Sequence, residues 1–162
     1  MEVEDLFQVG DKVFYPMYGA GVIEAIEERE IQGKTQEYCV IAIPLSKMDV
    51  MIPVKVIKKS RIRSITSRKV AKEILSDFDN KVSDCSLSWK ERLKKNTEKM
   101  KTGEMQDTAE VVRDLLHYER EKALNSVEKQ LLDRAKRILI SELIMIKDIT
   151  ENEAAELLKL TS

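Results

Sequence analysis

The sequence has few of the residues on which most catalytic and metal sites depend. It contains 1 histidine and 2 cysteines in 162 residues. No C-x-x-C, H-E-x-x-H or glycine-rich phosphate-binding motif occurs, so the sequence indicates neither a zinc site nor a nucleotide-binding loop. The single histidine, His117, lies between Leu116 and Tyr118 in a helical pattern, which favours a packing or surface role. We therefore expect a binding protein that is not an enzyme and that needs no cofactor and no metal.

The chain also lacks the features of an exported or membrane protein. No apolar run approaches the ~18 residues of a membrane-spanning helix. The first ten residues, MEVEDLFQVG, are acidic, whereas a secretory signal begins basic and continues apolar. The cysteines, Cys39 and Cys85, are far apart, and Cys39 lies in an apolar, strand-like run that favours a buried, reduced thiol. These features predict a cytoplasmic protein without membrane contact.

Glycine and proline are scarce, and all of them except Gly103 lie within the first 65 residues. In that part, short apolar or alternating segments separated by turn residues predict strands at 11–16, 21–31, 37–45 and 48–54. The alternation slips near Ala25, and Gly33 marks a turn. Residues 37–45 are apolar nearly throughout, as expected of a strand that is covered on both faces. The pattern predicts a small, curled antiparallel barrel or sheet.

From about residue 67 the apolar residues recur with helical spacing. Candidate caps at the helix starts are Ser67, Ser88 with Glu91, Asp107 with Glu110, Asn125 with Glu128, and Thr150 with Glu153. The helix after Asn125 is apolar on nearly all sides, which predicts the buried centre of a compact helical domain. Its apolar residues are Val127, Leu131, Ala135, Ile138, Leu139, Ile144 and Ile146. The preceding helix has one apolar face, formed by Val112, Leu115, Leu116 and Tyr118.

Charge is segregated along the chain, although the net charge is −1. Residues 1–54 hold ten acidic and four basic residues, whereas residues 55–72 hold eight basic residues and no acid. Residues 88–101 hold six basic and two acidic residues, and residues 103–162 are acidic again, with thirteen acids and nine bases. Such asymmetry predicts different partners for different parts of the chain. The stretch 55–72 is either a solvated surface or an additional contact with DNA.

The only tryptophan, Trp89, lies among charged residues in the segment LSWKERLKKN. Ser88 and Glu91 match the S-x-x-E capping box, which places Trp89 at the first helical position, where its own helix has no preceding turn to cover the indole. Either the ring docks on a neighbouring helix as a core residue, or it projects from the domain. The cations that follow it are Lys90, Arg92, Lys94 and Lys95. An aromatic ring beside cations favours nucleic-acid binding, because cations release counterions from phosphates and the ring wedges or stacks against bases.

Two patterns, in this order, resemble those of the CarD/CdnL family of bacterial transcription regulators. The first, V-G-D-x-V-x-Y-P-x-x-G-x-G, is present at Val9, Gly10, Asp11, Val13, Tyr15, Pro16, Gly19 and Gly21. The second comprises SWKERLKKN and AEVVRDLLHYEREKALNSVEKQLLDRAKRILISEL. The resemblance covers nearly the whole chain. It implies an α+β protein, with a Tudor/SH3-like antiparallel β-barrel at residues 1–65, of the kind shared with transcription–repair coupling factor, and a DNA-contacting domain of about five helices at residues 66–162.

The resemblance further implies a global transcription regulator that reads no specific operator. The barrel is expected to bind the β subunit of RNA polymerase, through Arg29 and through Met51, Ile52 and Pro53; Met51 stands where some family members carry an arginine. The helical domain is expected to contact promoter DNA at the upstream edge of the bubble, near the −10 element. There Trp89 would act as a wedge that holds the open complex. The phosphate-contacting residues would be Lys90, Arg92, Lys94 and Lys95. A monomer is expected, associated with the nucleoid through RNA polymerase.

Two functions of other classes remain open. One is sequence-independent DNA binding that needs no polymerase, and the other is a protein–protein adaptor with Trp89 buried. A pulldown with polymerase subunits, together with tryptophan fluorescence in the presence and absence of forked DNA, would distinguish these two from the open-complex regulator.

Overall fold

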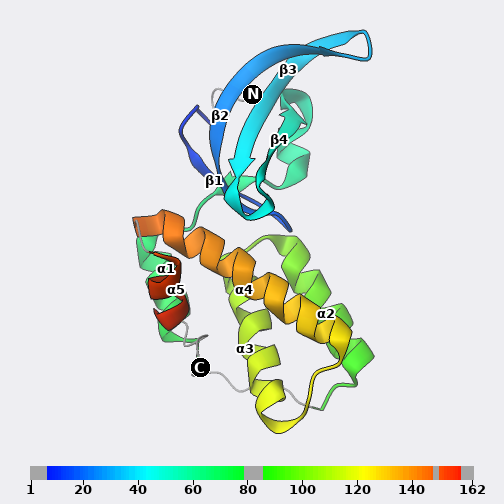
Figure 1. The fold of residues 1–162 in the computed structure, drawn as a ribbon, viewed down its shortest axis with the longest axis vertical. Coiled ribbons are helices and arrows are strands. Elements are labelled where there is room, and N and C mark those ends of the chain that lie inside the picture. Colours follow the sequence, from blue (N-terminus) through cyan, green and yellow to red (C-terminus); the bar gives the residue numbers. More distant parts are fainter. Residues whose placement is uncertain (1–6, 79–85, 148–149, 158–162) are drawn as a thin grey trace. The chain divides into compact units, whose positions relative to one another are not determined.

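The computed structural model describes residues 7–78, 86–147 and 150–157, which leaves Cys85 outside the described part of the chain. The chain divides into two compact units, Met1–Ile65 and Thr66–Ser162. The first unit is a β-sheet with short 3-10 helices, and the second consists of α-helices (Figure 1). This succession of strands and then helices confirms the α+β fold predicted from the sequence.

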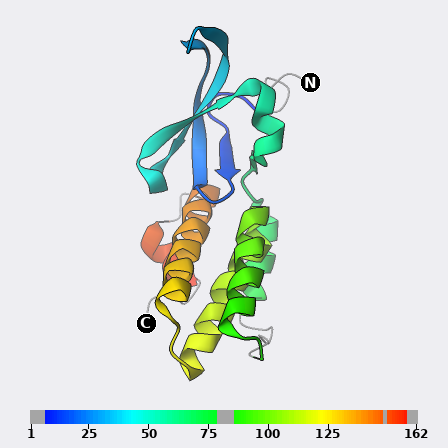
Figure 2. The same cartoon turned by 90° about the vertical axis from the view of Figure 1, so that its right-hand side faces the viewer.

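The first unit is a five-stranded antiparallel sheet with the strand order β4-β3-β2-β1-β5. Its strands are β1 (Lys12–Tyr15), β2 (Gly19–Ile31), β3 (Lys34–Ile43), β4 (Met48–Pro53) and β5 (Arg63–Ser64). The 3-10 helices η2 (Pro44–Ser46) and η3 (Val54–Ser60) follow β3 and β4. Among the described strands no pairing joins β4 to β5, so the sheet is curled but does not close into the predicted barrel (Figures 1 and 2).

Strand β3 is central to the core of this unit. The core cluster comprises Phe7, Val13, Ile23, Cys39, Ile41, Ile43, Ile52 and Ile57. Because successive residues of a strand point to opposite faces, Tyr38 and Val40 face away from Cys39 and Ile41, yet they too are buried. This confirms that β3 is covered on both faces. Cys39 is a free, buried thiol, as predicted, and burial raises its pKa.

Strands β2 and β3 form a long hairpin with one irregularity. The pairing shifts register between Ile23 and Ala25, so the slip in the alternation predicted near Ala25 is a β-bulge. From the pair of Glu28 and Glu37, where β3 no longer pairs with β4, the two strands run on to the turn as a two-stranded ribbon (Figure 1). Gln32 (φ 54°) and Gly33 (φ 75°) close the ribbon. Two successive residues with positive φ are typical of the type I′ turn, which matches the twist of a hairpin.

Gly21 lies where β2 passes too close to β3 to carry a side chain. A Cβ atom at this position would lie 2.4 Å from the carbonyl oxygen of Ala42. Because a backbone oxygen in a paired strand cannot move aside, we expect Gly21→Ala to lower the free energy of unfolding by about 1–3 kcal/mol in urea denaturation. Gly33→Asn is the control, because asparagine tolerates positive φ and no atom lies within 4 Å of a Cβ there. Equal losses in the two variants would contradict the prediction.

The described residues of the second unit form five α-helices, which agrees with the prediction of about five. They are α1 (Arg68–Ser76), α2 (Trp89–Thr102), α3 (Met105–Glu121), α4 (Ser126–Lys147) and α5 (Glu151–Leu157). The side chain of Ser67 caps α1, and the Oδ1 atom of Asn125 accepts a hydrogen bond from the backbone N–H of Glu128 at the start of α4. The start predicted after Asp107 is wrong. Helix α3 begins at Met105, directly after the left-handed Gly103 that ends α2.

Helix α4 is buried on one face in its first half, whereas every residue from Ile138 to Ile146 is buried or half-buried, so the prediction of a helix covered on nearly all sides fails only for the first half. Its buried residues are Glu128, Leu132, Ala135, Ile138, Leu139, Glu142 and Leu143. This spacing of mostly three or four residues traces a single stripe, whereas Val127 is 48% exposed. Both glutamates in the stripe accept hydrogen bonds from other segments of the chain. Thr66 donates to Glu142 from its backbone N–H (2.7 Å) and its hydroxyl (2.8 Å), and Arg92 donates to Glu128.

Helices α2, α3 and α4 pack against one another (Figures 1 and 2). On α3 the predicted apolar face is confirmed at Val112 and Leu115, whereas Leu116 and Tyr118 are only partly buried. Within the described residues, no helix is both long enough and apolar enough to cross a lipid bilayer.

Candidate nucleic-acid interface

The start of α2 has the capping box that the sequence predicted. The hydroxyl of Ser88 accepts a hydrogen bond from the backbone N–H of Glu91 (3.3 Å). In return, the Glu91 carboxylate accepts one from the backbone N–H of Ser88 (3.1 Å). These reciprocal bonds satisfy two amide groups that a helix start otherwise leaves unpaired. Trp89 is therefore the first residue of α2.

The indole of Trp89 is exposed, as expected for a ring at this position. The residue is 44% exposed, and the ammonium group of Lys90 lies 5.7 Å from the centroid of its ring. A core tryptophan would be almost wholly covered, so the interpretation of Trp89 as a core residue of the helical unit is wrong. The sequence-based adaptor hypothesis, which required a buried indole, loses its basis.

Arg92 does not lie at the surface with the neighbouring cations. Its side chain is 7% exposed, and it donates to both carboxylate oxygens of Glu128, at 2.6 Å and 2.7 Å. A third hydrogen bond goes to the carbonyl oxygen of Leu87 (3.1 Å), and the guanidinium carbon lies 3.7 Å from the ring centroid of Tyr118. A guanidinium held in this way cannot reach a phosphate. The DNA contact predicted for Arg92 is therefore replaced by a contact within the domain.

The electrostatics of Arg92 agree with this placement. The hydrogen bond to the Glu128 carboxylate is the main cause that raises the pKa of Arg92, and burial opposes part of this increase. Arginine suits such a site because its planar fork binds a carboxylate through two parallel hydrogen bonds. Arg92, Asn96 and Met100 recur every four residues and together form the buried face of α2. Because two of these three residues are polar, their spacing gave no signal of burial in the sequence.

The lysines of α2 lie on its other faces. With ~100° between successive residues of a helix, Lys90 and Lys94 fall together on the side opposite Arg92. Lys95 falls beside the buried face, ~60° around the axis from Arg92 and ~120° from Trp89. All three lysines are exposed. The exposed start of α2 therefore combines one aromatic ring with Lys90, while Lys94 and Lys95 lie more than one turn further along the helix, ~140° and ~120° around its axis from Trp89.

The predicted polymerase-binding residues lie in two places. Arg29 is half-exposed on the β2–β3 hairpin, where its Nε atom donates to Glu27 (2.7 Å), and it pairs with Gln36 on β3. Met51 pairs with Val40, four residues further along β3, which corresponds to about 13 Å at the rise of a strand. Arg29 and Met51 are therefore not neighbours.

Met51, Ile52 and Pro53 lie together on β4, which is an edge strand of the described sheet, as predicted. Ile52 is part of the core cluster, so its buried side chain anchors β4 on the core. The side chains of Met51 and Pro53 are partly exposed. An edge strand that is anchored on the core, and that has no partner strand on its outer side among the described residues, is a suitable site for pairing with a strand of another protein.

The basic stretch 55–72 is divided between the two units. Its first part spans η3 and β5 in the sheet unit, where the guanidinium carbon of Arg63 lies 4.4 Å from the ring centroid of Phe14. Its last three basic residues, Arg68, Lys69 and Lys72, are exposed on α1 of the helical unit. The stretch is thus two separate groups of cations on two folded units.

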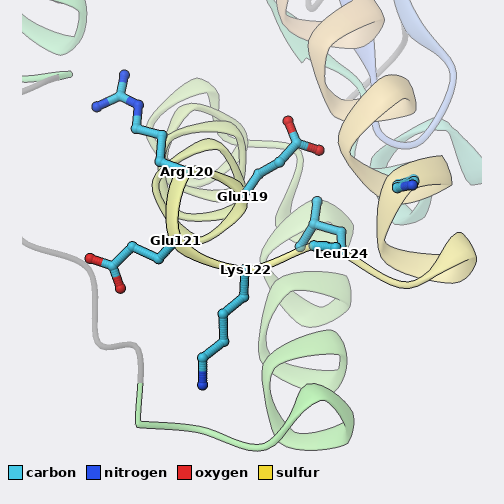
Figure 3. A pocket seen from close by; sticks show the side chains of 7 residues that line it. Glu119, Arg120, Glu121, Lys122 and Leu124 are labelled. Carbon is cyan, nitrogen blue, oxygen red and sulfur yellow. The ribbon is translucent and has the colours of Figure 1, made fainter.

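A shallow pocket of about 330 Å³ lies at the turn between α3 and α4. It is lined by Glu119, Arg120, Glu121, Lys122, Ala123, Leu124 and Lys129. In Figure 3 the side chains of Arg120, Glu121 and Lys122 extend in different directions from the end of α3. Because these mixed charges do not converge on a common point, the pocket does not have the features of a ligand site.

Comparison with known proteins finds similarity over most of the chain. Residues 7–66 match the family described as the CarD-like/TRCF RID domain, and residues 73–159 match the family described as the CarD C-terminal domain. The chain is 52% identical over 148 residues to the putative transcription factor YdeB of Bacillus subtilis (strain 168), over 91% of this chain and 97% of that protein. The solution NMR structure of the N-terminal domain of Myxococcus xanthus CarD is 25% identical, over 36% of this chain and 79% of that domain, with a TM-score of 0.31.

Proposed function

Because the chain belongs to the CarD-like family of transcription factors, which has an RNA polymerase-interacting domain, we propose that it stabilises promoter open complexes in the bacterial cytoplasm. In this proposal the sheet unit binds the β subunit of RNA polymerase, and the helical unit contacts DNA at the upstream edge of the bubble. The observation that carries the proposal is Trp89, which is exposed at the capped start of α2 beside Lys90.

The wedge has a simple energetic basis. Inserting an aromatic ring into a stacked duplex costs a few kcal/mol of unstacking, and a step that is already open does not carry this cost, so the ring binds the open state more tightly than the closed duplex. Only such a difference in affinity shifts the equilibrium between two states. About 1.4 kcal/mol shifts it tenfold, and removing the exposed part of an indole from water can supply this amount. Lys90 and Lys94 would hold the phosphates, and Lys95 would contact a more distant part of the backbone.

The sheet unit is suited to a protein partner. Residues 1–54 of this unit, which include β1 to β4, hold ten acidic and four basic residues, which disfavours contact of that part with phosphates. The five basic residues at 55–63 lie in the same unit, on η3, β5 and the segment between them. Strand β4 would extend a sheet of the β subunit through main-chain hydrogen bonds, and Met51 would supply an apolar contact. Arg29 would add a separate contact from the hairpin. The proposal therefore assigns polymerase binding and DNA binding to different units of the chain.

A substitution on β4 tests the polymerase contact. We expect Met51→Glu to weaken the binding of the full chain to core RNA polymerase by about tenfold, because it places a charge in an apolar contact. The measurement is biolayer interferometry, with thermal melts to verify folding. Val56→Glu is the control, because Val56 is exposed on η3, outside the proposed contact. If Met51→Glu binds polymerase like the unsubstituted protein, β4 is not the contact surface.

DNA binding is expected to be weak, tolerant of sequence and sensitive to salt. Each neutralised phosphate contributes about 0.9 to the slope of log affinity against log salt concentration, so three lysines give a slope of about −3 at most. Lys94→Ala should reduce this slope by about 1, whereas Lys34→Ala, on the β hairpin, should leave it unchanged. Fluorescence titrations of unrelated forked duplexes measure it. A strong preference for one sequence would contradict the proposal, and an unchanged open-complex lifetime would favour DNA binding that acts without polymerase.

A further inference from the structure

One guanidinium group connects the start of α2 to two other helices. Arg92 donates to Glu128 in the first turn of α4, and its guanidinium stacks on Tyr118 in the last turn of α3. Glu128 is itself held, because its backbone N–H donates to the cap residue Asn125 (2.8 Å). The side chain of Arg92 is therefore fixed from two helices that are distant from it in sequence.

The same guanidinium also reaches back across Trp89. Its Nη1 atom donates to the carbonyl oxygen of Leu87 (3.1 Å), two residues before the tryptophan, while the backbone N–H of Arg92 donates to the carbonyl oxygen of Ser88 (2.9 Å). The second bond belongs to the helix itself, whereas the first links the backbone just before Trp89 to the buried ion pair of Arg92 and Glu128. The capping box of Ser88 and Glu91 orders the helix start locally. The bond from Arg92 to Leu87 connects the residue before this cap to Glu128 of α4.

We propose that Arg92 and Glu128 are positioning residues for Trp89: their ion pair holds the start of α2 so that the exposed indole keeps one orientation. This inference rests on the function proposed above, because the orientation matters only if the ring is a wedge. A wedge must enter a base step along a defined direction, and each arrangement that points elsewhere lowers the fraction of molecules competent to bind. Arg92 thus contributes to DNA binding without touching DNA.

The test removes the ion pair and retains the packing. The double variant Arg92→Met with Glu128→Leu replaces both charges by apolar side chains of similar length, so no unpaired charge is left in the core. The bond to the Leu87 carbonyl is lost with the guanidinium. The matched control is Lys99→Met with Glu110→Leu, which removes another ion pair of α2, to α3 (2.9 Å), near the opposite end of the helix. If the double variant does not fold, Arg92→Lys replaces it, because an ammonium group cannot keep the parallel bonds to Glu128 and the bond to Leu87 together.

The first measurement concerns the orientation of the ring in the protein alone. Trp89 is the only tryptophan, so time-resolved fluorescence anisotropy reports its motion without labelling. We expect the amplitude of the fast, sub-nanosecond decay to rise roughly twofold in the Arg92/Glu128 variant, as it does for a side chain on a loosened segment. The Lys99/Glu110 control should leave it unchanged. An unchanged amplitude in the Arg92/Glu128 variant would overturn the inference whatever the outcome for transcription.

The second measurement is the lifetime of the promoter open complex. We expect the Arg92/Glu128 variant to shorten it about threefold or more, and the same substitutions to have no further effect when Trp89 is already alanine, because groups that act through one another are not additive. An equal shortening in the Trp89→Ala background would show that the pair acts elsewhere and would overturn the inference. If Trp89→Ala alone leaves the lifetime unchanged, the proposed wedge function fails, and the anisotropy result still decides whether the pair orients the ring.

Discussion

Replacing Arg92 by methionine alone is expected to lower the free energy of unfolding by about 3–5 kcal/mol. The loss arises because Glu128, whose side chain is 1% exposed, would keep a charge without a partner. Adding Glu128→Leu should recover most of the loss, because a buried ion pair contributes little more than apolar residues of the same volume. Urea denaturation of the single and double variants measures both effects without the charge screening that guanidinium chloride introduces.

The control for this prediction is the ion pair between Lys99 and Glu110, whose side chains are 22% and 20% exposed. Burial by itself raises the pKa of Glu110, but the hydrogen bonds from Lys99 and Gln106 outweigh it, so the pKa is lowered overall. Because solvent still reaches this pair, Lys99→Met should cost less than about 1 kcal/mol. A similar cost for Lys99→Met and Arg92→Met would mean that burial of the pair is not what makes Arg92 important.

Replacing Trp89 by alanine is expected to shorten the lifetime of the open complex by about tenfold or more, which corresponds to ~1.4 kcal/mol of lost stabilisation. The free energy of unfolding should fall by less than about 1.5 kcal/mol, because the residue is 44% exposed. A fully buried tryptophan would lose about 3–5 kcal/mol on the same change. Lifetime assays and thermal melts on the same protein therefore separate a wedge from a core residue.

Trp89→Phe is the matched variant, because it keeps an apolar ring of smaller area at the same position. We expect it to retain part of the lifetime and nearly all of the stability. A large fall in melting temperature for Trp89→Ala, with an unchanged lifetime, would contradict the wedge proposal.

Features that depend on neighbouring residues could be predicted from the sequence. The capping box of Ser88 and Glu91, the hairpin turn at Gly33 and the caps at Ser67 and Asn125 all involve groups within about three residues of each other, so their chemistry is complete in a short segment. The position of Trp89 as the first residue of α2 followed from the same local pattern, but whether the ring docks on a neighbouring helix or projects was decided by the structure.

Local signals failed where two of them competed. Asp107 with Glu110 resembles a capping box as closely as Ser88 with Glu91 does, yet α3 starts two residues before Asp107. The left-handed Gly103 ends α2, and the helix resumes at Met105, whose side chain is buried. Burial of an apolar side chain in the core outweighed a cap that was available slightly later.

What only the tertiary structure decided is which charges lie in the core. Among the cations after Trp89, Arg92 is buried because Glu128, 36 residues later in the chain, supplies a carboxylate from the neighbouring helix α4. The apolar pattern of α4 placed Val127 and Leu131 in the core, whereas the buried stripe begins at Glu128. A sequence reports the charge of each residue but not its partner, and the cost of burying a charge depends on that partner. The sequence by itself determined the succession of strands and helices and the capped start of α2 at Trp89, whereas tertiary packing decided that the ring is exposed and that Arg92 is buried beside Glu128.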